Sequence, residues 1–143
     1  MMLSLALAQQ LKKAGLEWQP RLHDVFALPE RGMDDRRFIL TEVLAYIELF
    51  HGSPVVTFHG TAEWALDYIL QTEAVWVPTE TQLRQQVQGK ARNLLLQETA
   101  DGYEVRCNFR GQALSFAAAD ACEAYASALL QILLQQAADP GAN

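Results

Sequence analysis

The chain has 143 residues, of which 50% are hydrophobic and 20% charged, and its formal net charge is -6. This length allows a core that needs no metal or disulfide, and the composition excludes an intrinsically disordered chain. Gln, Glu or Asp interrupts each apolar run, which argues against a membrane-spanning helix. We predict a single domain over residues 1–137 and a disordered tail over residues 138–143.

The first residues, MMLSLALAQQLKKAGL, have the period of a helix rather than the order of a signal peptide. Lys12 and Lys13 follow the apolar stretch instead of preceding it. Ser4 suits the N-cap and Gly15 the end of this helix. Its apolar face contains Leu7, Ala8, Leu11 and Ala14. Without an export signal we expect a cytoplasmic protein in which Cys107 and Cys122 are reduced core residues.

The middle of the chain predicts short strands and helices in alternation. We expect strands at 23–28 and 37–40, with a turn-rich loop over 29–35 between them. A helix is predicted from Thr41 to Phe50, with a continuing strand as the alternative. The next predicted elements are a strand over 54–58, a largely buried helix over 61–71 and a strand over 74–77. A further helix is predicted to begin at the capping box Thr79-x-x-Gln82 and to end near Gly89.

The last third has the clearest pattern. Residues 93–99 and 103–109 flank Asp101-Gly102 and predict a β-hairpin, and Arg110-Gly111 leads into a third strand. Four alternating residues are predicted to be buried, namely Tyr103, Val105, Cys107 and Phe109, and the three between them exposed, namely Glu104, Arg106 and Asn108. Asp120 caps a final helix with a wide apolar arc centred on Leu129. We expect either the N-terminal helix or a second copy of the chain to cover its flank.

These elements predict an α+β fold. It consists of a mostly antiparallel sheet with a C-terminal three-stranded meander, covered by the N- and C-terminal amphipathic helices, and the middle segment can contribute a parallel pair.

Acidic residues dominate the central segment. No Lys or Arg lies between Phe38 and Leu83, whereas six acids do: Glu42, Glu48, Glu63, Asp67, Glu73 and Glu80. Because phosphate binding needs clustered basic residues, we expect no nucleic-acid partner. The acidic segment is either a solvated surface or a binding surface for another protein.

No motif for catalysis or cofactor binding is present. The chain lacks the phosphate loop, the dinucleotide-binding glycines and the nucleophile elbow. The spacing of His23, His51 and His59 and of the two cysteines does not suit a metal, so we expect no cofactor and no metal site. The candidate ligand-binding residues are two carboxylates at i, i+4 and three aromatic neighbours: Glu63, Asp67, Trp64, Tyr68 and Trp76. Their alternative interpretation is the wet side of a helix beside an aromatic core cluster.

Three stretches, LALAQQLKKAGLEWQP, FHGTAEWALDYI and VWVPTETQLRQQV, resemble small uncharacterised bacterial proteins, some of which carry a pilus-assembly label. An ATPase role within that label conflicts with the missing phosphate loop. In size, acidity and its amphipathic last helix the chain also resembles type III secretion chaperones, which are dimers that hold a partner chain. Our leading expectation is a non-enzymatic binding or adaptor domain, either monomeric or homodimeric. The alternatives are a small enzyme or small-molecule binder and a subunit of a larger assembly.

Overall fold

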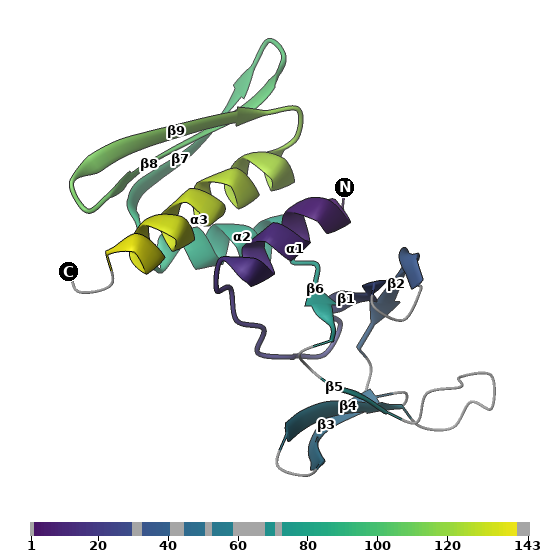
Figure 1. Cartoon of the computed structure of the whole chain (residues 1–143). Helices are drawn as coiled ribbons and strands as arrows, with labels where there is room; N and C mark the ends of the chain where they lie inside the picture. Colours follow the sequence, from purple (N-terminus) through teal and green to yellow (C-terminus); the bar gives the residue numbers. More distant parts are fainter. Residues whose placement is uncertain are drawn as a thin grey trace. The chain divides into compact units, whose positions relative to one another are not determined.

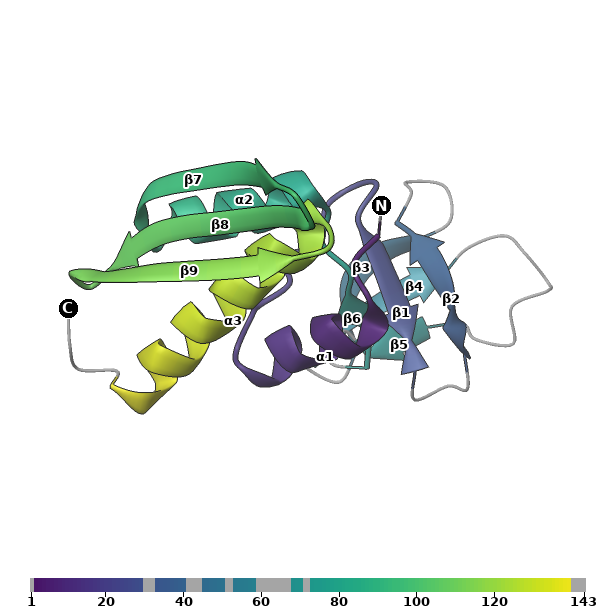
Figure 2. The same cartoon turned by 90° about the horizontal axis from the view of Figure 1, so that it is seen from above.

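The computed structural model describes residues 2–29, 33–40, 45–50, 53–58, 68–70 and 73–139 (Figures 1 and 2). The fold is α+β, and every strand pair in this part of the chain is antiparallel. Contacts between residues divide the chain into two compact units. Unit 1 combines Met1–Glu17 with Pro78–Asn143, and unit 2 consists of Trp18–Val77.

Unit 1 is a helical layer under a three-stranded meander. The sheet contains β7 (Arg92–Thr99), β8 (Gly102–Phe109) and β9 (Gln112–Ala118) in the order β7-β8-β9. Beneath one face lie α1 (Leu5–Lys13), α2 (Glu80–Gln88) and α3 (Ala121–Ala138), with α3 against β8 and β9, α2 against β7, and α1 against α3 (Figures 1 and 2). The predicted meander and its helical cover are therefore confirmed.

Side chains cap each helix where the sequence predicts it. The Ser4 hydroxyl accepts a hydrogen bond from the Leu7 amide at 3.3 Å, and Gly15 follows α1 with a φ of 106°. At α2, Thr79 and Gln82 form the reciprocal capping box. The Asp120 carboxylate accepts from the Glu123 amide at 2.9 Å. These bonds satisfy amide groups that a helix leaves without a partner in its first turn.

The alternation in β8 produces the predicted two faces. Val105, Cys107 and Phe109 are buried, Arg106 and Asn108 are exposed, and the two residues nearest the first turn, Tyr103 and Glu104, are intermediate. Leu129 of α3 is completely buried, and α1 packs against α3, as the wide apolar arc predicts. Both cysteines are buried free thiols.

Unit 2 contains two short antiparallel sheets. One has the order β2-β1-β6, from β1 (Val25–Leu28), β2 (Met33–Ile39) and β6 (Val75–Trp76). The other has the order β3-β4-β5, from β3 (Ala45–Phe50), β4 (Ser53–Phe58) and β5 (Tyr68–Leu70). A cluster of buried side chains packs on the first sheet, with Phe38 and Trp76 at its margin: Trp18, Phe26, Leu28, Leu40 and Ala74.

Four expectations for this region differ from the structure. The described part of 41–50 is the strand β3, which is the alternative to the expected helix, and the end of the helix expected over 61–71 is the strand β5. No parallel pair occurs in the described strands. Strand β2 also begins at Met33, inside the segment expected to be a loop. In the two segments expected to be helices the backbone pairs with a neighbouring strand instead, and such tertiary pairing overrides local helix propensity.

The prediction of one domain over 1–137 stays a prediction, because two compact units can belong to one domain. Ala138, expected in the tail, is the last residue of α3, and residues 140–143 lie outside the described residues. None of the described helices is both long and apolar enough to cross a bilayer.

Candidate functional site

The sheet of unit 1 has one face that no helix of this unit covers. We call it the open face, and Figure 2 views it from above, with the helices behind it. The strand register places its side chains together: Leu95 and Gln97 of β7, Glu104, Arg106 and Asn108 of β8, and Ala113, Ser115 and Ala117 of β9. All except Glu104 are exposed. This surface mixes a half-exposed leucine, small residues and one ordered polar cluster.

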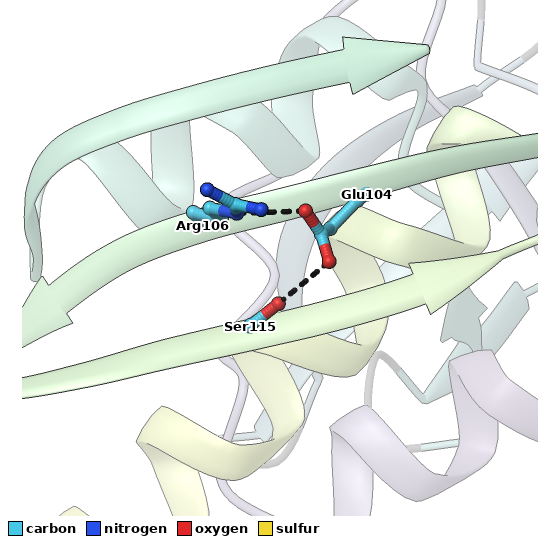
Figure 3. Close-up of polar contacts among 3 residues, drawn as sticks. All are labelled: Glu104, Arg106 and Ser115. Atoms are coloured by element: carbon cyan, nitrogen blue, oxygen red, sulfur yellow. Dashed lines mark hydrogen bonds and ion pairs between the residues drawn. The ribbon is translucent and has the colours of Figure 1, made fainter. Parts of the chain in front are cut away.

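Glu104 is at the centre of that cluster (Figure 3). Its Oε1 accepts a hydrogen bond from the Arg106 Nε at 2.7 Å, and its Oε2 accepts one from the Ser115 hydroxyl at 3.0 Å. Arg106 and Glu104 share a face because they are two residues apart on β8, and Ser115 is directly opposite Arg106 in the β8–β9 register. The cluster therefore ties the central strand to β9.

The hydrogen bond from Ser115, followed by that from Arg106, lowers the pKa of the Glu104 carboxyl. A carboxylate that is held ionised and engaged through both oxygens is poorly suited to be a general acid or base near neutral pH. The Arg106 side chain keeps 58% of its exposure, so its guanidinium can still donate to an incoming group. The arrangement suits recognition rather than catalysis.

The pairing register between β8 and β9 could have been derived from the sequence. Arg110-Gly111 is a two-residue turn between alternating strands, and such a turn pairs Phe109 with Gln112 and hence Arg106 with Ser115. The alternation within β8 predicts Glu104 and Arg106 on the wet face, whereas Ser115 joins them only when the pairing is extended across this turn to β9.

Of the five ligand-binding residues predicted from sequence, the described structure places only Tyr68 and Trp76. Glu63, Trp64 and Asp67 lie outside the described residues. Tyr68 begins β5, opposite Thr57, whereas Trp76 lies in the other sheet of unit 2, opposite Phe26. Trp76 is half-buried against the aromatic cluster, in line with the core interpretation. The pocket itself stays a prediction.

The most deeply buried charged side chain among the described residues is Asp24, which is 4% exposed. It accepts hydrogen bonds from the Trp18 Nε1 and the Arg21 amide, both at 2.9 Å. These bonds fix the indole of Trp18 within the core cluster and satisfy the Asp24 carboxylate as an acceptor. Asp24 therefore has a structural role, which no local sequence pattern had indicated.

Metal ligands do not assemble in the described part of the chain, where no three His, Cys, Asp or Glu side chains come together. His23 is exposed in a turn, with a φ of 72°, while His51 and His59 lie outside the described residues.

Comparison with known proteins returns no match among family models, curated proteins or solved structures. The resemblance to small bacterial proteins accordingly stays a prediction.

Proposed function

We propose that the chain is a non-enzymatic binding or adaptor domain of the bacterial cytoplasm, which holds another protein on the open face of unit 1. The observation that carries this proposal is the composition of that face. Leu95 is 50% exposed, the three outward residues of β9 are small, and the Glu104–Arg106–Ser115 cluster is already ordered. Small and rigid contact surfaces lose little conformational entropy on binding.

The two units differ in net charge, and neither has the positive net charge that would favour a nucleic-acid partner over a protein. Nine acids against four bases give unit 2 a net charge of -5, and eight against seven leave unit 1 near neutrality at -1. Among the acids of the central segment, the described side chains are half-buried Glu73 and exposed Glu80. The open face carries one acid, Glu104, and one base, Arg106, and such a near-neutral surface suits a protein partner better than a phosphate backbone.

Capture from a bacterial lysate tests the proposal with immobilised full-length protein. The variants Leu95→Arg and Ala113→Arg place a long charged side chain on the open face, and Gln85→Arg places one on the exposed surface of α2. We expect the wild type and Gln85→Arg to retain the same proteins and both open-face variants to lose them. If Leu95→Arg and Ala113→Arg retain the same lysate proteins as the wild type does, the proposal is contradicted.

A small-molecule binder is the second candidate, because of one atom in unit 2. The indole Nε1 of Trp76 is buried and has no hydrogen-bond acceptor among the described residues, although the side chain as a whole is only half-buried. A ligand with an acceptor atom would satisfy that donor. A thermal-shift screen of polar metabolites should then give hits that Trp76→Phe removes, and hits that survive in Trp76→Phe would argue against this site.

A further inference from the structure

The two edges of the unit 1 sheet differ in how they are protected. On β7, Arg92 and Glu98 carry charge, the register shifts between Arg92 and Leu95, and Asn93 has a φ of 55°. Charges and bulges of this kind stop a sheet edge from pairing with another chain. Strand β9, Gln112–Ala118, has no charge, no proline and no register shift along its pairing with β8. The fold thus protects one edge and leaves the other suitable for pairing.

The backbone groups on the outer side of β9 can be assigned to particular residues. Arg110 and Gly111 form a two-residue turn with φ values of 52° and 79°, which makes Phe109 and Gln112 a hydrogen-bonded pair. Alternation then directs the amides and carbonyls of Ala113, Ser115 and Ala117 away from β8. Within the described sheet, no strand lies on that side. The same three residues present the small side chains of the open face.

The helical layer of unit 1 is wider than the sheet above it. In Figures 1 and 2, α1 and the C-terminal half of α3 lie on the β9 side and extend beyond that strand. Leu114 and Phe116, on the helix side of β9, are only half-buried, and Leu134 in the C-terminal half of α3 is 49% exposed. Apolar surface is therefore available next to the free backbone groups.

This layout favours a single strand over a second copy of the chain. In a two-fold dimer built by pairing β9 with β9, each copy would bring its own projecting helices under the partner's strands, and the two helical layers would compete for one space. An extended segment brings no helical layer. The absence of charge along β9 also favours an uncharged segment.

We propose that β9 accepts an extended, uncharged segment of another protein as a fourth strand, with small side chains toward the open face and apolar side chains toward α1 and α3. This inference rests on the proposed binding function and names the chemistry of its partner. The backbone of Ala113, Ser115 and Ala117 supplies the new hydrogen bonds, and the helical layer receives the apolar side chains.

A peptide with the sequence of residues 111–119 and two lysines at each end is a suitable probe. When it pairs antiparallel with β9 so that the two copies of Ser115 are opposite each other, Ala113 of one strand is opposite Ala117 of the other and Leu114 is opposite Phe116. The small residues then share one face and the apolar residues the other. We expect saturable binding to the full-length protein. N-methylation of the peptide at its copies of 113, 115 and 117 should abolish binding, whereas N-methylation at 114 and 116 should not, since those amides face away from β9. Equal binding of the two methylated peptides, or no binding of the parent peptide, would overturn the proposal.

Variants of the protein provide a second test. Ala117→Pro removes one outward amide and leaves the β8 ladder intact. We expect a ~3- to 10-fold weaker affinity for Ala117→Pro, which corresponds to one net hydrogen bond. Thr99→Val is the control, because Thr99 is exposed on β7 at the opposite edge of the sheet, and this variant should bind as the wild type does. Thermal melts verify that both variants fold, and the methylated peptides test the edge even if Ala117→Pro does not fold.

The outcomes separate this inference from the proposed function. If Leu95→Arg abolishes lysate capture while Ala117→Pro preserves it, the open face binds a partner without strand addition and only the present inference fails. If the peptide binds with the expected methylation pattern but lysate capture ignores the open-face variants, the proposed function fails instead. A concentration-dependent dimer in sedimentation that Ala117→Pro dissociates would identify a second copy as the occupant and overturn the inference.

Discussion

Gly102 is the residue at which backbone conformation and close packing most clearly coincide. It has a φ of 154°, and a Cβ atom there would collide with the Ala118 carbonyl oxygen and lie 2.9 Å from the Ala119 Cα. Both neighbours are backbone atoms at the end of β9, which cannot turn aside as a side chain can.

We therefore expect Gly102→Ala to lower the free energy of unfolding by ~2–4 kcal/mol, as strain and overpacking combine. Gly89→Ala is the matched control, because Gly89 has a φ of -72° and its added Cβ would make ordinary contacts of 3.6 Å or more. Urea denaturation of the two variants checks this, and equal stabilities would show that the turn at Gly102 can relax.

The lowered pKa of Glu104 gives a second prediction at this scale. The Ser115 hydroxyl is its largest cause, so Ser115→Ala should raise the Glu104 pKa toward its ordinary value. Because the folded pKa lies below the unfolded one, the stabilisation is present above the ordinary carboxyl pKa and is lost as the pH falls through the folded value. NMR titration of the Glu104 side chain measures the shift. Asn108→Ala, on the same face, should leave it unchanged, and an unchanged pKa in Ser115→Ala would contradict the hydrogen bond.

Among the elements, α3 is central to unit 1, since it contacts the sheet and both other helices. Leu129 is 0% exposed and Leu134 is 49% exposed on the same helix, so they form a matched pair of leucines. Leu129→Ala should destabilise the protein by ~2–5 kcal/mol, because it leaves a cavity. Leu134→Ala should cost well under that amount. Thermal melts compare them, and similar midpoints would mean that α3 is packed differently.

Sequence predicts the elements of unit 1 well because their signals agree with one another. In β8 the strict alternation, the two-residue turns and the following cap at Asp120 all indicate the same strand and helix boundaries. The caps of α1 and α2 are similarly local, since each bond joins residues three apart. Such signals require no knowledge of distant parts of the chain.

The strands of unit 2 were harder to predict because apolar residues there fit two periods. Val43, Leu44 and Ile47 match a helix, but Ala45, Ile47 and Leu49 also alternate as one side of a strand. Pairing decides between them: β3 aligns with β4 from Ala45↔Phe58 to Phe50↔Ser53. The three residues of β5 similarly adopt a strand against β4, although their local sequence favours a helix. The open face was missed for a related reason, since it depends on register between strands.

At the scale of the molecule, the cysteines and the tryptophans, which can be followed separately in solution, lie in different units. Cys107 and Cys122 are buried in unit 1, and the three tryptophans, Trp18, Trp64 and Trp76, belong to the sequence of unit 2. Desolvation by burial raises the pKa of both thiols, which keeps them protonated and unreactive in the folded protein.

Both thiols should therefore resist a disulfide reagent at pH 8 until unit 1 opens, and Leu129→Ala should speed their modification. Since the folded thiol pKa is raised, the related stabilisation is present below the ordinary thiol pKa and is lost as the pH rises through the folded value. The time course of thiol modification measures the opening, and tryptophan emission from the same sample follows unit 2. Immediate modification of the native protein would show that one thiol is accessible.

The insertion of residues 18–77 between the two segments of unit 1 also determines an order of events on the ribosome. Helix α1 is synthesised first, but α3, against which it packs, is completed only after the inserted unit and the whole β7-β8-β9 meander. At ~5–20 residues per second this interval lasts roughly 6–25 s. The apolar side chains Ala8 and Leu11 are without their final neighbours throughout that time, so the nascent chain exposes them to chaperones before unit 1 can fold.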